Sequence, residues 1–322
     1  MLIAAFKWLG LQLFVICAMI GAFSLLVWLF NGREEALGFI NTAVVRMKGP
    51  WVWTFGYGLA FFITDRGRQL PAVLDAVLVP NEVTAEVSQR IAASTHHSNA
   101  YRFTLPLTVL GVFLTYVYGI PNRGVAYVLL YLCLLLIYYI SGFLLFHFIE
   151  VILAFETLFK KMDRVEFKQV YSPLHLEYLT SYLAITTVIG LISIYAGFRG
   201  TVTAGFEFQH EVWRVFLLTP LILFIPGTLF YDYYPRYVLR KIVQHKVFNL
   251  MARLGASDAS NAPELVSKLR DASAVNSQIL PFVDYKTLPS YLIAILFVIS
   301  LAYNNDPAVS SFLQKLTQMG SK

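Results

Sequence analysis

The chain has 322 residues, of which 57% are apolar or aromatic and only 14% are charged, and its mean hydropathy is +0.63. Soluble domains average about 25% charged residues, so this composition excludes an ordinary soluble domain and predicts that most of the surface faces lipid or other helices. The net charge of +6 arises from cations clustered between apolar runs, where they set membrane orientation, and we therefore expect no nucleic-acid partner.

Seven apolar segments are candidates for membrane helices, because a helix needs about 20 apolar residues to cross the bilayer. In chain order they are residues 9–30, 51–64, 103–120, 125–148, 178–198, 215–230 and 288–303. The first is longer than the apolar core of a signal peptide and lacks a small-residue cleavage site, so we interpret it as an uncleaved anchor. Residues 51–64 suit either a short span or a re-entrant hairpin, which leaves six or seven crossings.

Charge asymmetry favours seven crossings over six. With seven, seventeen of the 25 Lys and Arg residues lie on one side of the membrane and eight on the other. Cations accumulate on the cytoplasmic side, so we predict a cytoplasmic N-terminus beside Lys7, an outer C-terminus, and a multi-pass protein of a plasma or bacterial inner membrane. The predicted fold class is all-α: a polytopic transmembrane helical bundle of about seven spans with a small cytoplasmic helical cap.

This topology divides the chain into three segments. Residues 1–235 form the first six spans, residues 236–286 a basic cytoplasmic helical segment, and residues 287–322 the last short span and outer tail. The cytoplasmic loops 65–102 and 149–177 are also predicted to be helical. In the first loop an apolar face precedes a second helix that starts at Asn81, and the second loop continues the fourth span. That apolar face consists of Leu70, Val73, Leu74 and Val77.

Four tyrosines crowd around Pro235 where the sixth span ends: Tyr231, Tyr233, Tyr234 and Tyr237. A phenol at the interface can bury its ring and keep its hydroxyl wet, so we predict an interfacial belt. Pro235 suits the first turn of a new helix, which would be amphipathic over residues 236–254 and lie on the membrane or continue the span. We predict that its basic face binds anionic lipid or an acidic partner through Arg236, Arg240, Lys241 and Lys246.

His147 and Glu150 stand three residues apart and share one helix face near the inner end of the fourth span. A di-iron carboxylate bundle needs the opposite order in two copies, so we predict an ion-sensitive polar pair, with a structural pair at headgroup level as the alternative. The sequence contains none of the hydrolase, zinc-protease, P-loop or dinucleotide motifs, and its two cysteines lie in apolar runs. We expect no catalytic residues, no cofactor and no metal site.

These features favour a subunit of an oligomeric membrane channel or pore-type effector, with a cytoplasmic surface for sensing or assembly. A non-catalytic membrane scaffold or signalling anchor is the alternative, and a small-solute transporter is the third hypothesis. An enzyme is the least favoured class, because paired catalytic groups at membrane depth are missing from the sequence. The expected partners are membrane lipid, further copies of the chain, and a cytoplasmic protein at residues 236–286.

Overall fold

The computed structural model describes residues 2–46, 58, 61–118, 125–168, 178–192, 225–256, 262–278 and 292. Its regular elements are helical throughout these ranges, so the predicted all-α class is confirmed. The labelled helices are α1 (Leu2–Asn31), α2 (Arg33–Asn41), η1 (Thr42–Arg46), α4 (Leu70–Val77), α5 (Glu82–Ser94), α6 (His97–Tyr118), α7 (Val125–Lys160), η2 (Met162–Arg164), α10 (Ile225–Ala256) and α11 (Ala262–Gln278). Residues 61–67 and Tyr178–Ile192 are also helical.

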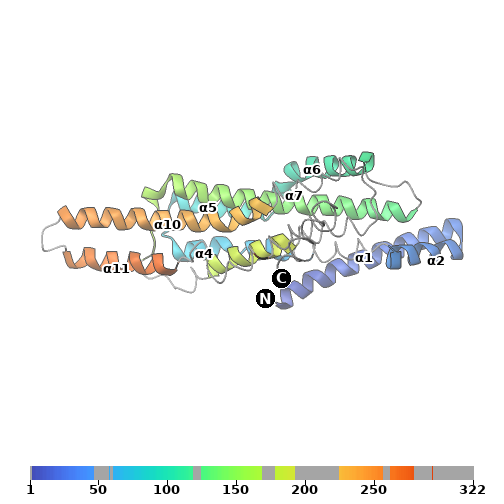
Figure 1. Cartoon of the computed structure of the whole chain (residues 1–322), viewed down its shortest axis with the longest axis horizontal. Helices are drawn as coiled ribbons and strands as arrows, with labels where there is room; N and C mark the ends of the chain where they lie inside the picture. Colours follow the sequence, from blue (N-terminus) through green and yellow to red (C-terminus); the bar gives the residue numbers. More distant parts are fainter. Residues whose placement is uncertain are drawn as a thin grey trace, which may run out of the picture.

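The described residues form an elongated molecule with two regions (Figure 1). We call residues 2–46, 97–118 and 125–146 the apolar arm, which contains α1, α2, α6 and the first part of α7. We call residues 61–94, 147–168, 178–192, 225–256 and 262–278 the helical domain, which contains α4, α5, the rest of α7, α10 and α11. Helix α7 belongs to both regions. Its 36 residues correspond to a length of about 54 Å.

Large apolar side chains cover the outside of the apolar arm. Within the described residues, two stretches are long and apolar enough to cross a bilayer, Phe6–Asn31 and Tyr138–Lys160, and they favour a membrane association. The seven predicted spans are not confirmed. Only these two stretches of the described residues are long and apolar enough, Tyr178–Ile192 is apolar but shorter, and 193–198, 215–224, 288–291, 293–303 and most of 51–60 lie outside the described residues. The exposed set on α1 and α6 includes Phe6, Phe14, Leu29, Phe30, Leu105, Val109 and Phe113.

The chain reverses direction after α1. Gly32 has a φ of 93°, a conformation that glycine adopts without the strain of a side chain, and α2 then packs back on α1 with Phe39 stacked on Phe23 at 6.4 Å. At the other end of α1, Phe61 stacks on Trp8 at 5.3 Å, and a Cβ on Gly58 would lie 2.6 Å from Leu9 Cδ2. Phe39 therefore lies beside the later turns of α1 and Gly58 beside its first turns.

The helical domain has a conventional apolar core. The predicted apolar face of residues 70–77 is confirmed, since all four of its residues are buried in α4. The predicted helix start at Asn81 is confirmed, and Asn81 caps α5: its Oδ1 accepts from Thr84 N at 2.9 Å and its N donates to Thr84 Oγ1 at 2.8 Å. The core joins six helices and includes Ile63, Leu74, Val87, Ile91, Val151, Phe155, Leu158, Leu183, Tyr231, Leu239 and Ile242.

Helix α10 differs from the prediction for this segment. It runs without interruption from Ile225 to Ala256 with Pro235 in its interior, so the expected new helix with Pro235 in its first turn is wrong. The helix also passes through the predicted segment boundary after residue 235. The prediction that residues 149–177 begin by continuing the fourth span is confirmed by α7, which ends at Lys160. Helix α11 then covers Ala262–Gln278, within the segment that was predicted to be helical.

Candidate functional site: a buried polar junction

Polar side chains meet inside the helical domain where it joins the apolar arm. We call this cluster the polar junction and define it as His147, Ser94, Gly67, Tyr182 and Tyr231. The five residues come from five helices: α7, α5, helix 61–67, helix Tyr178–Ile192 and α10. Burial of so many polar groups at one place is costly unless they are paired, so the junction is the first place to look for function.

His147 is fully buried and bonded to α5. Its Nδ1 lies 2.8 Å from the hydroxyl of Ser94, which itself donates to the carbonyl of Ile91 at 2.6 Å. A serine hydroxyl has one proton, so the imidazole donates from Nδ1 and its neutral form keeps Nε2 as an acceptor. That Nε2 has no hydrogen-bond partner among the described residues.

Gly67 and two tyrosines close the junction around the imidazole. A Cβ on Gly67 would lie 2.8 Å from His147 Cε1 and 3.2 Å from the Tyr182 hydroxyl, so only glycine lets helix 61–67 approach this closely. Tyr182 donates to the carbonyl of Ile63 at 3.4 Å. Tyr231 stacks on Phe148 with ring centroids 4.3 Å apart and is itself completely buried.

Three polar contacts connect one face of α5 to α7 and the turn after it. Ser94 bonds His147, Arg90 Nε lies 2.6 Å from Glu150 Oε2, and Glu86 Oε2 lies 2.8 Å from Lys161 Nζ. The three α5 residues are spaced at i, i+4 and i+8, which places them on one helix face. The predicted pair is thus two separate links: His147 and Glu150 each bond a different α5 residue.

A second polar feature lies within α10. Asp232 and Arg236 form an ion pair whose side chains are only 4% and 3% exposed. Burial raises the pKa of Asp232, and the adjacent guanidinium opposes this shift. Nε and Nη1 of Arg236 have no partner among the described residues. Breaking a buried pair on one side leaves an uncompensated charge, so this pair constrains which residues α10 can carry.

The predicted basic face and tyrosine belt are corrected in two positions. Arg236 is buried against Asp232 and cannot face headgroups, and Tyr231 is buried in the core and cannot lie in an interfacial belt. Of the other residues, Tyr234 donates to Glu156 and Lys246 Nζ bonds the carbonyl of Asp163 at 3.2 Å. Lys241 is exposed, whereas Tyr233, Tyr237 and Arg240 are half-buried. The physical reason is that α10 turns this face toward α7.

The polar junction connects helices and is closed to solutes in this conformation. Ser94 and His147 resemble a nucleophile and its base in distance, but both are completely buried, so no substrate reaches them. The described residues contain no group of three or more His, Cys, Asp or Glu arranged to hold a metal ion. The arrangement holds five helices together: hydrogen bonds join α5 to α7 and helix 61–67 to helix Tyr178–Ile192, and a ring contact joins α10 to α7.

Sequence reasoning missed Ser94, Gly67, Tyr182 and Asp232 as site residues. For Asp232 a signal existed, since it stands four residues before Arg236 and such pairs meet on a helix. For Ser94 and Gly67 the signal is tertiary and invisible locally. Comparison with known proteins adds no assignment: no family model, curated protein or solved structure matches this chain.

Proposed function

We propose that the protein is a subunit of an oligomeric membrane channel or pore-type effector. In this proposal the apolar arm lies in the bilayer and the helical domain projects on the cytoplasmic side. State changes in the domain reach the membrane through α7. The membrane is a plasma membrane or bacterial inner membrane.

One observation carries the proposal: α7 is a single helix that is part of both regions. It is about 54 Å long, whereas the hydrocarbon core is about 30 Å thick. Its early residues Val128 and Leu135 are exposed apolar side chains, and its later residues Val151 and Leu158 are completely buried in the domain core. A displacement of the domain therefore moves the spanning part of the same helix.

The topology proposed here keeps seven crossings. The return of the chain along α1 supports a crossing between Phe39 and Phe61, because a second passage is needed to bring Phe61 beside Trp8. The N-terminus is then cytoplasmic and the C-terminus outside, in agreement with the cation asymmetry. Reporter fusions after Gly32 and after Lys322 should both report the outer side, and a cytoplasmic report from either would remove this topology.

The proposal is tested by conductance of the reconstituted full chain. Liposomes or planar bilayers with the purified protein should give discrete current steps that empty bilayers lack, and particles in nanodiscs should contain four or more copies. Arg90→Glu should change the open fraction, because it breaks the Glu150 contact between α5 and α7. Arg68→Glu is the matched control, since Arg68 is exposed and its contact with Asp65 is long, at 4.0 Å. A monomer without current would contradict the proposal.

A non-catalytic scaffold is the second candidate, and a specific surface favours it. Phe248, Met251 and Val266 are exposed apolar side chains on α10 and α11, far from the apolar arm (Figure 1). Exposed apolar residues outside the membrane favour a protein partner at residues 236–286. A protein without current that retains a stable cytoplasmic partner after detergent extraction would fit the scaffold and exclude the channel.

A further inference from the structure

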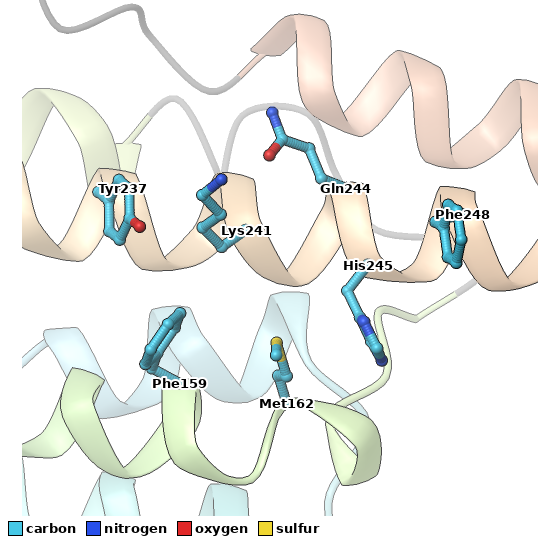
Figure 2. A pocket seen from close by; sticks show the side chains of 7 residues that line it. All are labelled: Phe159, Met162, Tyr237, Lys241, Gln244, His245 and Phe248. Atoms are coloured by element: carbon cyan, nitrogen blue, oxygen red, sulfur yellow. The ribbon is translucent and has the colours of Figure 1, made fainter.

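A hollow lies beside the end of α7, because α10 continues beyond it. Helix α7 stops at Lys160 and the chain turns through η2, while α10 extends to Ala256. The space left between them is a cavity of about 430 Å³. Figure 2 shows the seven lining residues: Phe159, Met162, Tyr237, Lys241, Gln244, His245 and Phe248.

Aromatic and sulfur-containing side chains form the walls of this cavity. Phe159 and Met162 come from the α7 side and face α10 (Figure 2). The rings of Phe159 and Tyr237 lie 6.2 Å apart at an angle of 42°. Phe248 is 70% exposed at the other end, eleven residues or about 16 Å along α10. Such walls favour a planar aromatic ring, which can stack on or pack edge-on against them.

The charged group of the cavity is a cation. Lys241 is exposed, its Nζ lies 5.6 Å from the Tyr237 ring centroid, and no carboxylate of the described residues is within ion-pair distance. The acid that touches the lining, Asp163, is already engaged by His245 Nε2 at 2.5 Å. Gln244 adds amide donors beside Lys241. The cavity therefore offers donors and positive charge to an anion.

We propose that this cavity binds a small molecule with a planar aromatic ring and one anionic group. The ring lies against Phe159 and Tyr237, the anionic group meets Lys241 and Gln244, and Phe248 closes the far end of the cavity. The volume falls in the range of about 300–1,000 Å³ that is usual for small-molecule sites. The contact between His245 and Asp163 fixes α10 to the turn after α7, so the site is held in place on both sides.

The test uses the full chain in nanodiscs and three matched probes: indole-3-carboxylate, its neutral carboxamide, and cyclohexanecarboxylate. Titration calorimetry against empty nanodiscs measures each affinity. The aromatic carboxylate should bind about tenfold more tightly than either other probe, because each of them lacks one of the two features.

Paired variants locate the binding. Lys241→Gln should weaken carboxylate binding about tenfold and abolish the discrimination against the carboxamide, while Lys246→Gln, on the same helix with its Nζ on Asp163, should stay within about twofold. Phe248→Ala should weaken binding about threefold. Its control, Met251→Ala, removes an exposed side chain that does not line the cavity.

Exposed Phe248 and Lys241 contribute little to the core, so these variants should fold like the parent. Equal affinity for the carboxylate and the carboxamide would overturn the proposal. The same conclusion would follow if Lys241→Gln and Lys246→Gln behaved alike, or if the protein gave no heat above that of empty nanodiscs. None of these readouts depends on conductance, so the site is tested separately from the channel.

Discussion

The apolar arm and the helical domain place their apolar side chains in opposite ways. In α1, Phe14 is 70% and Phe30 is 83% exposed, and the buried positions include the polar residues Gln12 and Ser24. In the domain, Phe155, Leu158 and Ile91 are 0% exposed, and charged side chains such as Lys160 and Glu86 lie outside. The domain obeys the rule for water, whereas the arm has the pattern expected where the solvent is hydrocarbon.

The two regions thus have the side-chain patterns expected for two different solvents, and α7 belongs to both regions. The change occurs near His147, where the helix first becomes buried on the side facing α5. Low exposure alone therefore does not mark the favourable positions for apolar side chains in this protein, because an apolar side chain exposed on the arm would suit a hydrocarbon solvent.

Matched phenylalanine truncations should show the largest difference between the regions. Phe155→Ala should lower the free energy of unfolding by about 3–5 kcal/mol, since it leaves a cavity in the core. Phe14→Ala removes the same ring from an exposed position and should leave domain unfolding unchanged. Urea unfolding of the full chain in nanodiscs measures both. Equal losses would mean that the arm also packs against protein, and the comparison would fail.

The buried ion pair of α10 extends this contrast to charged side chains in the helical domain. Arg236→Met should cost about 3 kcal/mol, at the low end for a broken buried pair, because Asp232 can then take up a proton. Burial already raises the pKa of Asp232. The native variant therefore binds more protons than the unfolded chain above pH about 3.9, and its stability should fall as the pH rises.

The matched double variant Asp232→Leu with Arg236→Met should recover most of that stability, since no unpaired charge remains. Its unfolding should also lose the pH dependence of the single variant. If the double variant were as unstable as Arg236→Met alone, the damage would come from lost packing of the arginine instead of charge.

Two glycines give the next largest contrast. Gly67→Ala should cost about 1–3 kcal/mol, because the new Cβ meets His147 at 2.8 Å. Gly38→Ala, in α2 of the arm, has nothing within 4 Å of its Cβ and should be neutral or stabilise the helix by up to about 1 kcal/mol. Thermal unfolding of both variants checks this. A harmless Gly67→Ala would show that helix 61–67 is free to move away from α7.

The contact between Arg90 and Glu150 should contribute less, since its side chains are 35% and 20% exposed. Either Arg90→Glu or Glu150→Arg should lower stability by about 0.5–1 kcal/mol, and the exchanged pair should regain part of this. A double-mutant cycle at low and high salt measures the coupling. Coupling energy near zero would leave Ser94 with His147, and Glu86 with Lys161, as the polar contacts that hold α5 to α7 and its following turn.

The smallest expected effect is the pH dependence at His97, on the border between the regions. Its ring stacks on Phe143 at 4.3 Å; burial and the nearby Arg68 lower its pKa below the usual 6.5. The unfolded chain then binds more protons just below pH 6.5, so stability should fall as the pH drops through that window. His97→Asn should flatten the profile, whereas His96→Asn should change it only slightly, because His96 is the smallest of the causes that lower the pKa of His97.

Local signals account for what the sequence predicts well. The helix start at Asn81, the apolar face of α4 and the continuation of α7 to Lys160 each depend on residues within a few turns, and all three are confirmed. The candidate site depends on contacts between distant residues: Ser94 and His147 are 53 positions apart, and Arg90 and Glu150 are 60. Residue types and spacing identified His147 and Glu150, but their partners follow only from helix packing.

The errors at Tyr231 and Arg236 have the same origin. Tyrosine and arginine next to an apolar run fit an interface in any membrane protein, so their environment depends on which face of α10 meets the neighbouring helices. The continuous passage of α10 through Pro235 turns both residues inward.

Pro235 has a mechanical consequence for the whole molecule. It supplies no N–H, so the carbonyl of Tyr231 loses its helical donor and α10 is weakest in bending at this level. Asp232 and Arg236 lie on either side of Pro235, and their ion pair connects the helix turns before and after it. Helix α7, which packs against α10, contains no proline and is continuous over its 36 residues. Bending at Pro235 would have to break the contacts of His245 and Lys246 with Asp163, because these hold the later part of α10 to the turn after α7.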